Sequence, residues 1–318
     1  MLVMKFGGTS VGDAGRMDSV AGLIAEARTG PRQLVVVVSA MAGVTNALFA
    51  AARGAAGGDE AKAHQQLDEL ASRHQEVARA LLTTPSELAA LEGVIGSHLE
   101  EAKRFCHSIA ILGEVTARTL DLVAGIGERL SSALLAALLR ERGVSAQAVP
   151  ATELIVTNDR FGAAEPDLGL SRPRVRARLL PLLEQGATPV VTGYIAATAD
   201  GVPTTLGRGG SDFTAAILGT CLDADEVWIW SDVDGILTAD PNIVPEARTL
   251  SELSYADAAA LAACGAEVLH PKTISPLVER GIPLRLLNSF RPAHPGTLIV
   301  RQPTSDRARP WPEQASRC

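Results

Sequence analysis

The sequence predicts an α/β fold in which helices cover both faces of a mainly parallel central sheet. Short apolar runs alternate with longer helical patterns along the chain, which is typical of β-α-β units. The run 34–38 is continuously apolar, as expected of a strand that is covered on both faces. Two glycine-rich turns each precede a helical pattern. The expected strands are 2–6, 34–39, 146–150, 189–194, 227–231 and 283–287.

The region from 47 to 122 carries almost no strand pattern. It is rich in Ala, Leu, Glu and Arg and is interrupted at Gly57-Gly58, Pro85 and Gly113, so we expect several helices there. A helical stretch of this length is more typical of a cap or a partner surface than of a catalytic site. The tail 301–318 is rich in Pro, Arg and Ser, and we expect it to be poorly ordered.

Length and charge exclude several classes of protein. A chain of 318 residues can bury a large core as one domain or as two lobes. The net charge of −7 and the isoelectric point near 5.5, with no compensating basic cluster, argue against a nucleic-acid-binding surface. The apolar runs are too short to span a membrane, and the first strand leaves no room for a signal peptide. We therefore expect a cytoplasmic protein without a membrane partner.

The cysteines and histidines show no metal-site spacing. Without a secretory leader the cysteines are expected to be reduced thiols; they are Cys106, Cys221, Cys264 and Cys318. The histidines on predicted helices are expected at the surface; they are His64, His74, His98 and His107. His270 precedes a proline that marks a helix start, so its expected role is structural.

The first glycine-rich turn follows the first strand and contains Gly7, Gly8, Thr9 and Ser10. Glycine has no Cβ and tolerates positive φ, so such a turn lets backbone N–H groups approach phosphate oxygens. Lys5 lies just before it and could place an ammonium against a transferring phosphoryl group. The lysine precedes the glycines, so this is not the P-loop spacing. Taken alone, the turn fits a phosphate site or a tight strand–helix connection equally well.

The second glycine-rich turn contains Arg208, Gly209, Gly210, Ser211 and Asp212, and an apolar helical pattern follows it. The guanidinium suits a carboxylate or a phosphate, and the aspartate could either cap the helix or orient a lysine or Mg²⁺. In isolation an N-cap and a loop arginine are the simpler interpretation. Two glycine turns with complementary charges favour one anion site built from both, and hence phosphoryl transfer.

These turns and further motifs in the same order resemble the aspartate kinases of the amino-acid kinase superfamily. The resemblance covers most of residues 1 to about 300. It implies the three-layer αβα sandwich of the carbamate kinase-like type, with an acceptor-binding N-terminal lobe over 1–205 and an ATP-binding C-terminal lobe over 206–300. The other matching segments are 38–46, 127–131, 157–162, 231–236, 268–271 and 295–299.

The acceptor site follows from the chemistry of an acidic amino acid and from matching motif positions. Arg208 suits the α-carboxylate and Glu128 the ammonium, while Ser39, Thr45 and nearby amides could donate to the side-chain carboxylate. Without the resemblance, Glu128 also fits a first-turn helix carboxylate, and the two hydroxyl residues fit turns or N-caps. The resemblance implies substrate binding for all four and for Ser211.

On the nucleotide side the sequence departs from the family. Ser231 and Asp232 match the segment that surrounds ribose and adenine. Many relatives, however, carry an aromatic residue at the position of Leu237 and an arginine at the position of Asn242. These two differences place the family's nucleotide contacts in doubt at both positions.

A third departure reverses a charge, because Glu267 stands where the family has a phosphate-facing lysine. Two unit charges ~5 Å apart at an effective dielectric of ~20 interact by roughly 3 kcal/mol, so the reversal could weaken ATP binding considerably. Three alternatives stay open. Lys272 replaces the missing cation, Glu267 turns to solvent, or the kinase activity is lost or altered.

The resemblance implies an aspartate kinase that uses ATP and Mg²⁺ to make 4-phospho-L-aspartate, the first step of the aspartate-family pathway. The attacking carboxylate is already ionised at neutral pH, because an unperturbed Asp has a pKa of about 3.9, so no general base is required. By resemblance Lys5 stabilises the developing charge, and Asp212 orients that lysine and the metal shell. Mg²⁺ bridges the phosphates, with no direct protein ligand assigned.

Two further functions stay open: a kinase for a related acid in a specialised pathway, and a degenerate homologue that binds a ligand and regulates a partner. Many aspartate kinases continue into ACT domains that bind lysine or threonine. This chain ends about 20 residues after 296–298, so we expect no ACT regulation unless a separate subunit supplies it. The expected partner is a small acid; the sequence leaves the oligomeric state open, with a homodimer as one option.

Overall fold

An eight-stranded sheet forms the centre of the protein, with strand order β3-β5-β2-β1-β8-β10-β11-β9. The computed structural model describes residues 1–30, 32–239, 244, 246–263 and 269–303. All neighbouring strands pair in parallel except β10 and β11, so the mainly parallel sheet is confirmed. The strands are β1 (Leu2–Phe6), β2 (Leu34–Val38), β3 (Ala146–Val149), β5 (Thr188–Thr192), β8 (Glu226–Ser231), β9 (Glu252–Ser254), β10 (Leu284–Asn288) and β11 (Thr297–Val300).

A second, three-stranded sheet joins β4 (Val156–Thr157), β6 (Ile195–Thr198) and β7 (Pro203–Thr205). The sequence predicts none of these strands, and it also misses β9 and β11. Each is two to four residues long, which is too short for an alternating pattern to stand out. The expected strand 189–194 is too long, because Tyr194 leaves the strand with φ of 68°.

Helices cover both faces of the central sheet, as expected. Because alternate strand residues face opposite sides, Leu2, Met4 and Phe6 join the core with α1 and α5, whereas Val3 joins the core with α6 and α7. Lys5 lies two residues after Val3, so its side chain points to the same face of the sheet, toward α7. The helices are α1 (Ala14–Ala27), α2 (Val44–Ala56), α3 (Glu60–Leu81), α4 (Pro85–Leu112), α5 (Ala117–Glu141), α6 (Leu168–Glu184), α7 (Gly210–Leu222), α8 (Tyr255–Ala263), α9 (Pro271–Arg280) and the 3₁₀ turn η1 (Ala151–Glu153).

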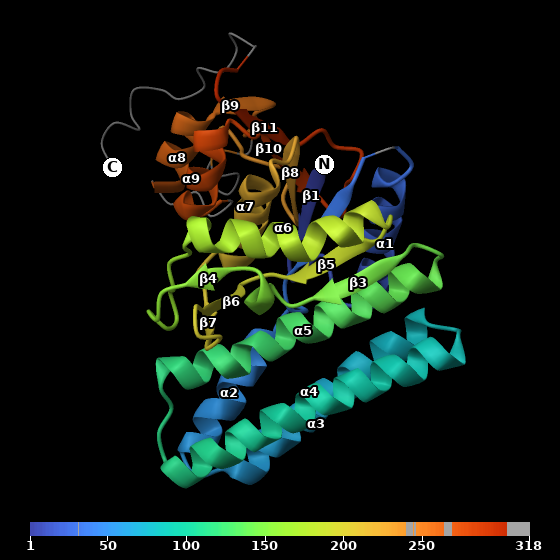
Figure 1. Ribbon diagram of the computed structural model, residues 1–318, viewed down its shortest axis with the longest axis vertical. Coiled ribbons are helices and arrows are strands. Elements are labelled where there is room, and N and C mark those ends of the chain that lie inside the picture. Colours follow the sequence, from blue (N-terminus) through green and yellow to red (C-terminus); the bar gives the residue numbers. More distant parts are fainter. Residues whose placement is uncertain (31, 240–243, 245, 264–268, 304–318) are drawn as a thin grey trace.

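The predicted helical region is confirmed, with interruptions at the expected residues. Helix α2 ends before Gly57, α4 begins at Pro85 and Gly113 caps its end in the left-handed conformation. Figure 1 shows α5 below the central sheet, with α3 and α4 beyond it. This region therefore forms a further layer outside α5.

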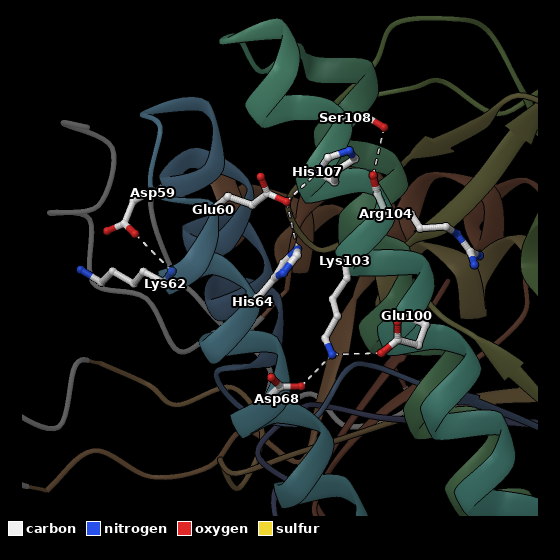
Figure 2. A network of polar contacts seen from close by, with 10 residues as sticks. All are labelled: Asp59, Glu60, Lys62, His64, Asp68, Glu100, Lys103, Arg104, His107 and Ser108. Atoms are coloured by element: carbon white, nitrogen blue, oxygen red, sulfur yellow. Dashed lines mark hydrogen bonds and ion pairs between the residues drawn. The ribbon is translucent and has the colours of Figure 1, made fainter.

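Polar contacts join α3 to α4 on their outer side (Figure 2). Glu60 Oε1 lies 2.8 Å from His107 Nδ1 and 3.6 Å from His64 Nε2. Lys103 Nζ lies 2.8 Å from Asp68 and 3.0 Å from Glu100. These partly exposed pairs each contribute little stability, typically ~0–1 kcal/mol, so buried apolar contacts hold the two helices together.

The surface position expected for His74 is wrong, because its side chain is fully buried. It lies on the apolar face of α3, one turn after Leu70, and its Nδ1 is 2.7 Å from the Leu70 carbonyl oxygen. Burial lowers the pKa of His74. His107 is exposed as expected, and the thiols Cys106 and Cys221 are free and buried.

Helix α5 is the one helix among the described residues that is long and apolar enough to cross a membrane. In this structure, 83% of its most apolar window is buried inside the protein, as in a core helix. The expectation that all apolar segments are too short considered only uninterrupted runs. The apolar residues of α5 are interspersed with small and polar ones such as Glu128.

Candidate active site

A cavity of about 420 Å³ opens at the carboxyl ends of β1 and β2. This edge of a parallel α/β sheet is where ligands bind in such folds. The cavity brings together residues from widely separated parts of the chain. The predicted residues that line it are Lys5, Ser39, Thr45, Glu128, Arg208, Gly209, Gly210, Ser211 and Asp212, and the structure adds Ala40, Gly162, Tyr194 and Gly207.

Lys5 and Asp212 form an ion pair in this cavity, with 2.5 Å between Nζ and Oδ1. Lys5 is 7% exposed in the central strand, and Asp212 lies in the first turn of α7. Gly209, not Asp212, is the N-cap of α7. The sequence left two roles open for Asp212, as a helix cap or as a group that orients a lysine or Mg²⁺. The structure shows the contact with a lysine.

The first glycine turn packs against the loop that follows β2. A Cβ on Gly8 would lie 2.7 Å from the Ala40 carbonyl oxygen, so only glycine fits there. The Gly7 N–H donates to the Trp230 carbonyl at 3.2 Å, and phosphate binding by this turn stays a prediction. The Thr9 carbonyl accepts a hydrogen bond from the Arg16 guanidinium, and the buried Ser10 hydroxyl forms a hydrogen bond with the Ser289 hydroxyl.

Gly8→Ala is expected to lower kcat/KM for the acceptor about tenfold or more. The added methyl group must displace the backbone at Ala40, whose N–H is 3.3 Å from Glu128 in the cavity. Steady-state kinetics with varied acceptor would measure the effect. The matched control is Gly54→Ala in α2, where nothing lies within 4 Å of the new Cβ. Wild-type kinetics for Gly8→Ala would show that this packing is unimportant.

The second glycine turn is built from close backbone contacts. Gly209 has φ of 70°, and a Cβ there would lie 2.7 Å from His270 Cβ. A Cβ on Gly210 would lie 2.7 Å from Tyr194 Cδ2. His270 is the N-cap of α9, so its structural role is confirmed, and it also packs against the turn. Arg208, which directly precedes these glycines, is exposed at the cavity.

Glu128 is the most deeply buried charged group of the cavity, at 3% exposure. Its Oε1 accepts from the Ala40 N–H at 3.3 Å, and its Oε2 has no hydrogen-bond partner among the residues described. Burial raises the pKa of Glu128 to about 8. Gly127 allows this approach, because a Cβ there would lie 2.7 Å from Ala40 Cβ. The carboxyl group can therefore take a hydrogen-bonding or cationic partner from a bound ligand.

Among the predicted nucleotide residues, Ser231 lies beside the first glycine turn. Parallel pairing of Phe6 with Trp230 places Gly7 next to Ser231, which is followed by the exposed Asp232. Leu237 is half-buried and bridges to Thr249.

The remaining predictions for the nucleotide side concern the missing cation. Asn242 and Glu267 lie outside the described residues. The exposed Lys272 lines a separate hollow of about 280 Å³ with Phe213 and Glu279. The structure therefore does not bring Lys272 to the main cavity.

Comparison with known proteins decides the family. The sequence profile of the amino acid kinase family matches residues 1–288. The chain belongs to the amino acid kinase family. Among curated proteins it is similar to chloroplastic aspartokinase 3 of Arabidopsis thaliana, at 39% identity over 96% of this chain and 54% of that relative. It is also 38% identical to lysine-sensitive aspartokinase 3 of Escherichia coli, over 95% of this chain and 64% of that relative.

Solved structures agree with the sequence comparison. The fold of this amino acid kinase is similar to that of E. coli aspartokinase III in complex with aspartate and ADP, with a TM-score of 0.87 and 36% identity. The similarity covers 96% of this chain and 65% of that chain. The present chain thus spans about half to two thirds of the length of these three relatives.

Sequence reasoning assigned no role to four residues that line the cavity of this amino acid kinase, Ala40, Gly162, Tyr194 and Gly207, or to Asp121, which supports it. Gly162 belongs to the segment 157–162, whose family resemblance was a usable signal. Tyr194 was assigned to a strand end, where a side chain at the cavity is not expected. Asp121 lies among helical residues with no motif of its own, and its role depends on contacts made after folding.

Proposed function

We propose that the protein transfers the γ-phosphoryl group of ATP to the side-chain carboxylate of L-aspartate, giving 4-phospho-L-aspartate and ADP. The observation that carries this proposal is the Lys5–Asp212 pair, which lies in one cavity with Glu128 and Arg208. A cation suited to phosphoryl transfer therefore lies in the same cavity as side chains suited to binding an amino acid. Similarity to aspartokinases, one of them solved with aspartate and ADP, supports the choice of substrates.

In this mechanism a side-chain carboxylate oxygen of aspartate attacks the γ-phosphorus in line. The bond from phosphorus to the β–γ bridging oxygen breaks, and ADP leaves with the electron pair. The nucleophile needs no base, because it is ionised at neutral pH. Catalysis therefore consists of positioning and charge neutralisation, with Lys5 against the developing negative charge and Asp212 holding the ammonium in place.

On the acceptor side, Glu128 receives the α-ammonium and Arg208 the α-carboxylate. Ser39 and Thr45 line the same cavity and would donate to the acceptor side chain, with Ser211 nearby. In the proposed division, residues 1–205 form the acceptor-binding lobe and 206–300 the ATP-binding lobe, which also contributes Arg208 and Ser211 to the acceptor site. The boundary in the central sheet runs between β1 and β8. Lys5 in β1 stands at that boundary.

The residues at the cavity fit a Mg²⁺ ion that is held mainly by phosphate oxygens. No cluster of three His, Cys, Asp or Glu side chains in the described part of the chain is arranged to hold a metal ion by itself. Asp212 supplies one carboxylate at the cavity, next to Lys5. A bound Mg²⁺ would neutralise charge on the transferring phosphoryl group.

The test is to measure ADP release with a panel of acidic amino acids and to trap the acyl phosphate with hydroxylamine. We expect turnover with L-aspartate and a hydroxamate product that depends on both ATP and aspartate. Turnover with a different acid only would replace the proposed substrate. Ligand binding without any turnover would indicate a regulatory homologue instead.

A further inference from the structure

Asp121 is a buried carboxylate that the proposed chemistry leaves unused. It lies on α5 and is 3% exposed. It precedes Glu128 by seven residues, which is almost two full helical turns, so the two carboxylates share one face of the helix. That face is directed toward the acceptor side of the cavity, where Glu128 lies.

The carboxylate of Asp121 accepts three hydrogen bonds from two separate segments. The Gly162 N–H donates to Oδ2 at 2.9 Å, and the Thr205 N–H donates to the same oxygen at 3.0 Å. The Thr205 hydroxyl donates to Oδ1 at 2.7 Å. One side chain on α5 therefore ties the 158–165 loop to the end of β7.

Both tied segments reach the cavity. Gly162 lines it directly, and Thr205 is three residues before Arg208. The Ala164 N–H donates to the Thr205 carbonyl at 2.8 Å, and a Cβ on Gly207 would lie 3.1 Å from the Gly162 carbonyl oxygen. The loop and the second glycine turn are thus in close contact where Asp121 holds them.

Tyr194 connects to the same network from another element. The Leu206 N–H donates to the Tyr194 carbonyl at 2.9 Å, and the Tyr194 N–H donates to Thr214 in α7 at 3.1 Å. Leu206 directly follows Thr205 in the chain. The segment that Asp121 holds is therefore hydrogen-bonded to the Tyr194 backbone through the Leu206 N–H.

We propose that Asp121 is a positioning residue for the acceptor half of the active site, acting through Thr205 and Gly162 on Arg208 and Tyr194. It does not line the cavity and contacts neither the acceptor nor ATP. Its removal leaves three donors without this acceptor, two of them buried, and allows the second glycine turn to shift relative to Glu128. The inference rests on the proposed function, because it concerns the acceptor subsite of that reaction.

Asparagine at this position keeps one oxygen that can accept both N–H groups, while its amide can donate to the Thr205 hydroxyl. Burial raises the pKa of Asp121, and the three hydrogen bonds oppose that rise. The proposed role depends on the geometry of the acceptor oxygens, which accept from Gly162 and Thr205. This distinction makes Asp121→Asn the conservative variant and Asp121→Ala the disruptive one.

The experiment measures steady-state kinetics and Tm for the whole chain with Asp121→Ala, Asp121→Asn and Thr205→Val. We expect Asp121→Ala to raise KM for aspartate about tenfold with KM for ATP within about twofold of wild type. Asp121→Asn is expected to recover most of the loss. Thr205→Val, which removes a single donor, is expected to raise KM for aspartate by a smaller factor and serves if Asp121→Ala does not fold.

The matched control is Glu141→Ala on the same helix. Glu141 also accepts from two backbone N–H groups and one threonine hydroxyl, those of Thr83 and Thr84, but it lies away from the cavity. We expect this variant to keep the wild-type KM for aspartate. A purely structural role for Asp121 would lower the Tm of Asp121→Ala without a selective change in KM for aspartate.

Two results would overturn the inference: unchanged KM for aspartate in all folded variants of Asp121 and Thr205, or equal increases in KM for aspartate and ATP. Failure of the proposed function would be detected separately, because the proposed function is tested on the wild-type chain with the panel of acidic amino acids. If another acid is the substrate, the same variants are measured with that acid, and the expected selective rise in its KM is unchanged.

Discussion

Replacement of Lys5 by methionine is expected to lower kcat about a thousandfold while the protein stays folded. The ammonium is the cation that the central strand delivers to the cavity, and it is fixed there by Asp212 at 2.5 Å. Methionine keeps an unbranched stem of similar length in the buried strand, so the packing under α7 is preserved. Asp212 keeps partial access to water, with 17% of its side chain exposed, and this limits the cost of losing its partner.

The measurement is single-turnover ADP formation at saturating ATP and aspartate, together with Tm. The matched control is Lys103→Met on α4, where the lysine pairs with Asp68 and Glu100 far from the cavity (Figure 2). That variant should keep wild-type turnover and lose little stability, because exposed ion pairs contribute ~0–1 kcal/mol. Near-normal turnover in Lys5→Met would remove this lysine from the mechanism.

A second large effect is expected in the pH dependence of acceptor use. The pKa of Glu128 is raised to about 8 by burial, so the empty site holds a neutral carboxylic acid at pH 7. An α-ammonium group binds well only to the ionised form. We therefore expect kcat/KM for aspartate to rise about tenfold per pH unit below pH 8 and to level off above it.

Glu128→Gln should remove this slope, because the amide does not titrate. It should also lower kcat/KM for aspartate about a hundredfold at pH 8.5, since a buried cation then loses its anionic partner. KM for ATP across the same pH range is the internal control. A pH profile that stays steep in Glu128→Gln would assign the ionisation to another group.

The pH dependence of Tm in wild type and in Glu128→Gln provides an independent check on this ionisation. The folded-state pKa of Glu128 lies above its ordinary value of 4.5, so the folded state binds more protons than the unfolded state between about pH 4.5 and 8. This group therefore makes wild-type stability fall as pH rises through that window. Glu128→Gln lacks this contribution, so its Tm relative to wild type should increase from pH 5 to pH 8.5.

Much of the fold could be predicted because the local sequence patterns match the environment that each segment has in the folded protein. The run 34–38 is apolar throughout and is buried on both faces as β2. The breaks at Gly57, Pro85 and Gly113 separate the helices where expected, since glycine and proline act on the backbone locally. The short strands β4, β6 and β7 were missed because each is only two to four residues long, too short to show an alternating pattern.

The site was predictable where chemistry and motif coincide. Lys5 and Asp212 were expected together and lie 2.5 Å apart. The conformation at Gly7 was not predictable, because its N–H pairs with the Trp230 carbonyl across the sheet. His74 shows the same limit, since the sequence suggests a surface residue on a helix whereas its side chain is fully buried.

The sequence by itself determined the alternation of strands and helices, the two glycine turns and the charged residues beside them. These depend on backbone preferences and on residue chemistry, which act over a few neighbouring positions. Only the tertiary structure decided that Asp121 joins two loops and that one oxygen of Glu128 is left buried without a partner among the described residues. Burial and hydrogen-bond geometry are properties of segments packed together, so they are fixed when the helix α5, the loop 158–165 and the strand β7 meet.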